Sequence, residues 1–125
     1  MKQLFLSLAL LIVLECQSQT KDEMEAKTIE VVTFELKDGI SKEEASSRLK
    51  ALNELIKDFD GFIKRSISCN EEGKWVDIVY WTSKELAMKA ASEVSKNGRA
   101  SKLFEIIDEK SIQMNHYQIM DSFNQ

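Results

Sequence analysis

The spacing of hydrophobic and polar residues changes several times along the chain, and each change marks a secondary-structure element. Residues 28–36, rich in Val, Thr, Ile and Phe, predict a β-strand. A helix is expected at residues 41–59, because its apolar residues recur at alternating steps of four and three and so share one face. Ser41 opens this helix with Glu44 three residues later, which predicts a capping box. The shared face carries Ala45, Leu49, Leu52, Ile56 and Phe59.

The rest of the chain repeats this alternation of strands and a helix. Residues 62–69 and 74–82 predict two strands joined as an antiparallel hairpin. A second helix is expected at residues 83–97, and a short helical turn at residues 103–107 precedes a last strand at residues 111–120. The order strand, helix, strand, strand, helix, strand predicts the α+β class, with a ferredoxin-like βαββαβ domain and a four-stranded antiparallel sheet.

The predicted sheet has two apolar faces but helices for only one of them. Right-handed crossovers place both helices on the same side. One face of the third strand carries Trp75, Asp77, Val79 and Trp81, and the other carries Val76, Ile78 and Tyr80. Burying apolar surface is favourable by about 25 cal/mol per Å², so a face-to-face homodimer is expected to cover the second face.

The N-terminus carries an apolar run at residues 4–14. It is shorter than the roughly 20 residues that span a bilayer, so no membrane span is expected. Residues 1–18 fit a signal peptide, which predicts a secreted or periplasmic protein. The alternative is a lipoprotein anchored through Cys16, although Glu15 departs from the small residue normal before such a cysteine. A core helix is disfavoured because the run lacks a polar stripe.

Composition narrows the functions of the remaining chain, in which residues 19–27 predict a flexible tether and residues 28–121 the folded domain. Lys and Arg number 17 against 21 Asp and Glu, and this net charge of -4 argues against nucleic acid as a partner. Two cysteines and one histidine exclude a zinc finger, a disulfide scaffold and a two-histidine metal centre. No phosphate-binding glycine loop or serine nucleophile motif is present. We therefore expect no metal and no cofactor.

Segments from all four predicted strands resemble the antibiotic biosynthesis monooxygenase superfamily, the dimeric α/β barrels. The segments are Val32–Gly39, Gly61–Phe62, Trp75–Trp81 and Met114–Tyr117. The resemblance extends over about residues 28–121 and implies a ferredoxin-like homodimer. The superfamily includes cofactor-free oxygenases of aromatic phenols and quinol-type substrates, haem-degrading enzymes, and proteins with no assigned reaction. Haem-degrading members carry an axial histidine on a helix, whereas neither predicted helix has a histidine here, so haem is not expected.

The candidate site combines acid–base residues with aromatic side chains. Cofactor-free oxygenation needs a base that ionises the substrate in a dry pocket. His116 is the expected base, because imidazole exchanges protons near neutral pH. Asp77 would orient His116 or act as the base itself; alternatively, it pairs with Lys64 or Arg65 across the hairpin. The expected substrate-binding residues are Phe34, Trp75, Tyr80, Trp81, Asn115 and Tyr117, with Phe104 as a further wall residue.

These residues cannot all serve one pocket. Asn115 and Tyr117 lie on the strand face opposite His116, so only one of the two sets can line a given side of the sheet. The leading hypothesis is a cofactor-independent monooxygenase acting on a small aromatic or quinol-like compound. The competing hypothesis is a non-catalytic domain for small-molecule binding or assembly, in which His116 is structural and the aromatic residues form core or dimer interface. Cys69 is expected to be a small buried hydrophobic residue.

Overall fold

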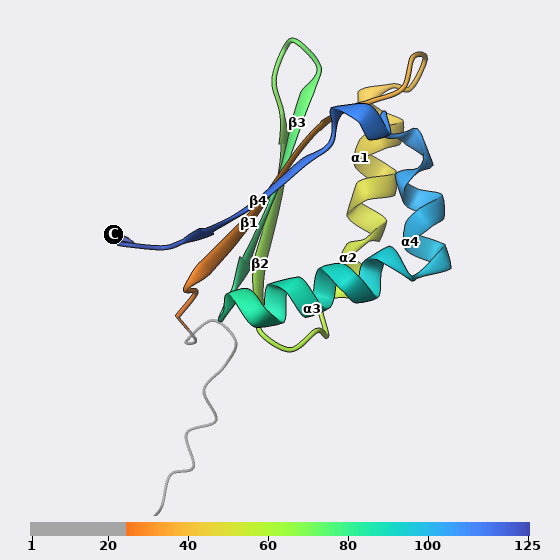
Figure 1. Cartoon of the computed structure of the whole chain (residues 1–125). Coiled ribbons are helices and arrows are strands. Elements are labelled where there is room, and N and C mark those ends of the chain that lie inside the picture. Colours follow the sequence, from red (N-terminus) through yellow and green to blue (C-terminus); the bar gives the residue numbers. More distant parts are fainter. Residues whose placement is uncertain (1–24) are drawn as a thin grey trace, which may run out of the picture.

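The computed structural model describes residues 25–125, which form one sheet with all helices on the same side (Figure 1). The elements in chain order are β1 (Thr28–Glu35), α1 (Lys42–Ala51), α2 (Asn53–Ile56), β2 (Phe62–Cys69), β3 (Lys74–Trp81), α3 (Lys84–Ser95), α4 (Gly98–Leu103), the 3₁₀ turns η2 (Phe104–Ile106) and η3 (Glu109–Ser111), and β4 (Gln113–Gln118). The predicted ferredoxin-like α+β architecture is confirmed. The predicted signal peptide at 1–18, Cys16 within it, and most of the tether lie outside the described residues.

The sheet has the order β2-β3-β1-β4, with every neighbouring pair antiparallel. The central strands β1 and β3 therefore pair on both sides, and β2 and β4 are the edges. The register aligns Arg65 with Val79, Val79 with Glu30, and Glu30 with His116. Residues directly opposite one another share a face, so these four side chains form a row across the sheet on the side that the helices cover.

The helix-covered face holds the hydrophobic core. Phe34 and Trp75 pack with Ala45 and Leu49 of α1, and Trp81 packs with Ala87 of α3. Four of the five predicted helical positions, Ala45, Leu49, Leu52 and Ile56, are buried, and Phe59 is half-buried. Ser41 and Ser83 cap their helices as expected, because each side chain accepts a hydrogen bond from a backbone N–H three residues later.

The first predicted helix is interrupted. Instead of one helix at residues 41–59, α1 ends at Ala51 and the single turn α2 follows Leu52. The Leu52 N–H donates to the carbonyls of Leu49 and Lys50, which tightens the chain at this point. The periodicity persists through the tightened turn, so the apolar face survives although the regular helix does not.

Two boundaries in the second half also differ from the prediction. Gly98, expected to terminate the second helix, begins α4, because the Asn97 side chain accepts hydrogen bonds from the backbone N–H groups of Arg99 and Ala100. The last strand begins at Gln113, because Ser111 belongs to the turn η3.

The opposite face of the sheet has no helix over it among residues 25–125 (Figure 1). Its central positions, Ile29, Val31, Val76 and Ile78, are half-buried, and Tyr117 is exposed. Cys69 is exposed at the end of β2, so the expectation of a buried cysteine is wrong. No helix in the described part of the chain is long and apolar enough to cross a membrane.

Candidate functional site

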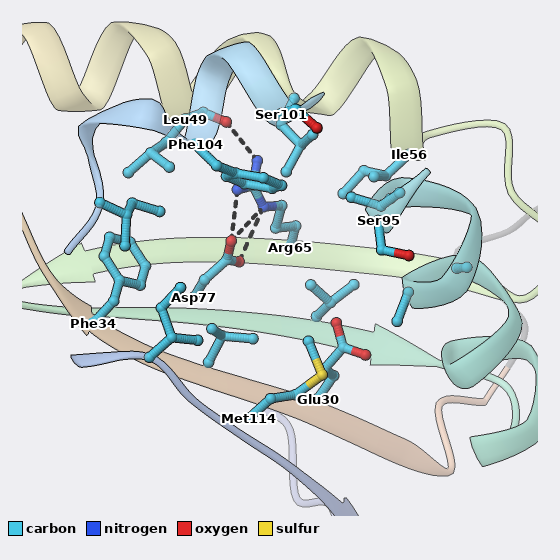
Figure 2. A pocket seen from close by; sticks show the side chains of 18 of the residues that line it. Glu30, Phe34, Leu49, Ile56, Arg65, Asp77, Ser95, Ser101, Phe104 and Met114 are labelled. Carbon is cyan, nitrogen blue, oxygen red and sulfur yellow. Dashed lines mark hydrogen bonds and ion pairs between the residues drawn. The ribbon is translucent and has the colours of Figure 1, made fainter. Parts of the chain in front are cut away.

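A cavity of about 670 Å³ lies between the helix-covered face of the sheet and the helices (Figure 2). Its walls are largely apolar and include Phe34, Leu49, Ile56, Val79, Trp81 and Phe104. Small-molecule sites typically enclose about 300–1,000 Å³ and combine apolar walls with a few polar groups. The cavity therefore has the size and wall chemistry of a site for a small organic compound.

Arg65 and Asp77 form a buried ion pair on the floor of this cavity. Arg65 Nε lies 3.0 Å from Oδ1 and 3.1 Å from Oδ2 of Asp77, and Nη2 lies 2.6 Å from Oδ2. The two side chains are 3% and 13% exposed. Of the pairings expected from the hairpin, Asp77 makes the one with Arg65. Both carboxylate oxygens accept from the guanidinium, so Asp77 is poorly placed to take a proton from a ligand.

Arg65 also ties the sheet to the interrupted helix. Its Nη1 donates to the Leu49 carbonyl at 2.7 Å and to Asn53 Oδ1 at 2.8 Å. The Leu49 carbonyl is one of the groups near the end of α1, where the helical ladder leaves carbonyls short of partners. Arg65 thus extends from β2 past the cavity floor to the break between α1 and α2, as Figure 2 shows.

Glu30 and His116 form a second pair on the same face of the sheet. His116 Nε2 lies 2.8 Å from Glu30 Oε2, and the side chains are 15% and 10% exposed. Burial raises the pKa of Glu30 above its ordinary value of 4.5, and the His116 hydrogen bond opposes this. The negative charge of Asp77 raises the pKa of Glu30 further.

The structure divides the predicted site residues between two faces. Asp77, Trp81 and Phe34 line the cavity, whereas His116 lies beside it and contacts the cavity-lining Glu30. Trp75 shares their face but stacks on Phe34, with ring centroids 6.2 Å apart, and borders a separate surface cleft.

Tyr80, Asn115 and Tyr117 lie on the uncovered face, as the register requires. Asn115 stands opposite Val31 and Tyr117 opposite Ile29, both on the outward side of β1. The Lys64 ammonium lies 5.2 Å from the centre of the Tyr80 ring. These residues do not border the cavity, and they belong to the surface on which a second copy was expected to pack.

Sequence reasoning missed Glu30 as a site residue. The signal was present, because Glu30 alternates with Thr28, Val32 and Phe34 along β1 and so occupies an inward position. Arg65 was considered only as a partner for Asp77. Its reach to Leu49 depends on the break in the first helix, which the sequence did not predict.

Two buried donors remain unpaired among residues 25–125: the indole N–H groups of Trp75 and Trp81. An unmet buried donor is unfavourable by about 1–3 kcal/mol. Within the same residues, no three side chains of the metal-binding types come together.

Comparison with known proteins gives a fold. No family model matches the chain, and no curated protein matches it in sequence. Among solved structures it is similar to a dimeric ferredoxin-like protein from an uncultured marine organism, with 21% identity over 85% of this chain and 96% of the other and a TM-score of 0.60. It is similar to SnoaB, a cofactor-independent oxygenase from Streptomyces nogalater, with 13% identity over 81% and 100% of the chains and a TM-score of 0.65.

A third structure is a proposed antibiotic biosynthesis monooxygenase from Bordetella bronchiseptica, with 15% identity over 77% of this chain and 99% of the other and a TM-score of 0.65. Identities this low carry information on the fold alone. The chain therefore has the ferredoxin-like α+β fold that these structures share, and this is the fold that the sequence resemblance implied.

Proposed function

We propose that the cavity binds a small aromatic or quinol-like compound and supports its oxygenation by O₂ without a metal or organic cofactor. The observation that carries this proposal is the apolar cavity of about 670 Å³ with buried acid–base groups on its floor. The similarity in fold to a cofactor-independent oxygenase is consistent with it.

The walls of the cavity suit a flat ring. Phe34, Trp81 and Phe104 offer aromatic surfaces, and Leu49, Ile56 and Val79 fill the space between them. Aromatic surfaces pair favourably in offset or edge-to-face contacts. The buried charged groups, Glu30, Arg65 and Asp77, lie on the floor, so they would fix the orientation of a ring that carries one or two oxygens.

The chemistry that this cavity would support begins with proton removal. A base takes the proton from a phenolic hydroxyl or an activated C–H, and the resulting anion transfers one electron to O₂. The substrate radical and superoxide combine into a peroxide, and loss of water leaves a new carbonyl. One oxygen atom of O₂ enters the product and the other leaves as water, so the substrate supplies every electron and no further reductant is required. The protein contributes a dry site and a positioned base.

A homodimer is part of this proposal. The dimeric ferredoxin-like neighbour supports it, and so does the row of half-buried apolar residues on the uncovered face of the sheet. We also propose export from the cytoplasm, which rests on the predicted signal peptide alone. Sequencing the N-terminus of the mature protein would test export and would separate cleavage after Ser18 from lipidation at Cys16.

An oxygen-uptake screen with anthrones and hydroquinones tests the function. We expect uptake with at least one substrate that follows saturation kinetics and yields the quinone-type product. The absence of uptake, combined with saturable binding of the same compounds by calorimetry, would favour the non-catalytic binding domain instead. If the protein shows no oxygen uptake and no binding of these compounds, the cavity is rejected as a site for aromatic compounds.

A further inference from the structure

We propose that Glu30 is the residue that accepts the hydroxyl proton of the bound compound, and that His116 is the positioning residue behind it. This assignment rests on the proposed function. It gives the role of base, which the sequence analysis expected for His116 or Asp77, to Glu30 on the neighbouring strand β1. It also specifies the ligand class as compounds with an ionisable hydroxyl group.

The Glu30 carboxylate is placed to contact a ligand in the cavity. Glu30 lines the cavity, and Figure 2 shows its carboxylate directed into it from β1. Only Oε2 is engaged, by His116 Nε2 at 2.8 Å, and Oε1 has no hydrogen-bond partner among residues 25–125. Glu30 therefore presents a free acceptor oxygen to the ligand while its other oxygen is held in place.

Glu30 differs from Asp77, the other carboxylate on the floor, in the group that it contacts. Both oxygens of Asp77 accept from Arg65, which is 3% exposed and cannot give up its proton. The partner of Glu30 is an imidazole, a group that can both take up and give up a proton. Only the Glu30 pair can therefore receive a proton and pass it on.

Glu30 is also more buried than most of the charged side chains that line the cavity. Apart from Arg65 and Asp77, which are paired with each other, the charged groups that line the cavity with Glu30 are Lys37, Glu105 and Glu109. These three are exposed, whereas Glu30 is nine-tenths buried. Burial disfavours the ionised carboxylate and so makes Glu30 a stronger base than an exposed glutamate. His116, 15% exposed on the edge strand β4, offers a route for the proton toward solvent.

The decisive experiment combines a binding readout with kinetics. The Glu30 carboxyl carbon is observed by ¹³C NMR in the full protein and assigned through Glu30→Gln. It is then titrated with 4-fluorophenol without O₂, so that oxygenation cannot consume the phenol. We expect the signal to move on saturation, and we expect Glu30→Gln to weaken binding about tenfold. In oxygen uptake, Glu30→Gln should lower kcat about 10²–10⁴-fold, the usual range for loss of a general base.

Two further variants separate positioning from structure. Glu35 is an exposed carboxylate on the same strand, and the control variant Glu35→Gln should match the wild type in both assays. His116→Gln keeps a hydrogen-bond donor but cannot titrate, so kcat should fall about tenfold with little change in KM, and the Glu30 signal should shift in the free protein.

The two hypotheses fail in different ways. A Glu30 signal unmoved by millimolar 4-fluorophenol, or a kcat for Glu30→Gln within twofold of Glu35→Gln, overturns the assignment of Glu30. A signal that moves in a protein without oxygen uptake retains Glu30 as the hydroxyl-binding residue and rejects the oxygenase.

Discussion

Removing one partner of the ion pair between Arg65 and Asp77 should be strongly destabilising, and the loss should depend on the burial of the pair rather than on its length. The chain offers a matched comparison, because Lys57 and Glu54 form an ion pair of nearly the same length on the surface. The shortest contacts are 2.6 Å in the first pair and 2.7 Å in the second. The side chains are 3% and 13% exposed in the first pair but 52% and 72% exposed in the second.

Asp77→Asn removes the charge and keeps the shape. The Arg65 guanidinium then stays buried with only neutral partners, and it cannot neutralise itself by losing a proton. Breaking a buried pair from one side is unfavourable by about 3–5 kcal/mol, and the lower end applies because asparagine still accepts one hydrogen bond. For a domain of this size, about 3 kcal/mol corresponds to a fall in Tm of roughly 15 °C. Glu54→Gln should leave Tm within the error of the wild type, since the exposed pair is screened by solvent.

Urea unfolding followed by circular dichroism, with calorimetry for Tm, measures both variants. The double variant Arg65→Met/Asp77→Leu should recover much of the lost stability, because two apolar residues leave no unpaired charge. Equal, small effects of Asp77→Asn and Glu54→Gln would refute the reasoning, since they would mean that water reaches the Arg65 guanidinium in solution.

Four further outcomes are expected. Gly61→Ala should be more destabilising than Gly73→Ala by about 1–3 kcal/mol in urea unfolding. Both glycines have a φ of 82°, but only at Gly61 would the new methyl group lie 2.6 Å from a leucine side chain. Equal effects of the two variants would contradict this. Because the pKa of Glu30 is raised in the native state, the native protein keeps a proton on Glu30 at pH values where the unfolded chain has lost it. The stability of the wild type should therefore fall relative to that of Glu30→Gln as the pH rises above 4.5. A difference in Tm between the two proteins that stays constant from pH 4 to 8 would count against this prediction. Cys69, exposed in the structure, should react with a thiol reagent without denaturant, and protection until unfolding would show that it is covered. Ile78→Lys on the uncovered face should convert a dimer into a monomer in light scattering, whereas an unchanged mass would place the interface elsewhere.

The period of the hydrophobic pattern was sufficient to predict the architecture. The β2–β3 hairpin begins and ends almost where the alternation does, since side chains on a strand must point in turn to the two faces. The helix boundaries were harder to predict. The break at Leu52 leaves the apolar spacing intact, and the cap at Asn97 is formed by an asparagine beside a glycine that resembles a helix end.

The candidate site could be predicted only in part. Asp77 and Trp81 were found because a charged residue among large apolar ones on one strand face is conspicuous. The Glu30–His116 contact depends on β1 pairing with β4 in one register, between residues 86 positions apart in the chain. A single sequence gives the face of each residue but not which residues of distant strands stand opposite one another.

Strands β1 and β3 contribute residues both to the cavity and to the uncovered face of the sheet. Along β1, Glu30 faces the cavity while Ile29 and Val31 face outward, and along β3, Asp77 alternates with Val76 and Ile78. A second copy packed on the outward residues would hold the spacing between these strands, and that spacing sets the separation of the Glu30 and Asp77 carboxylates. Since the negative charge of Asp77 raises the pKa of Glu30, the acid–base behaviour of the cavity would then depend on a face that the ligand never touches. In the proposed dimer, assembly and chemistry would therefore be coupled through the pleat of the sheet.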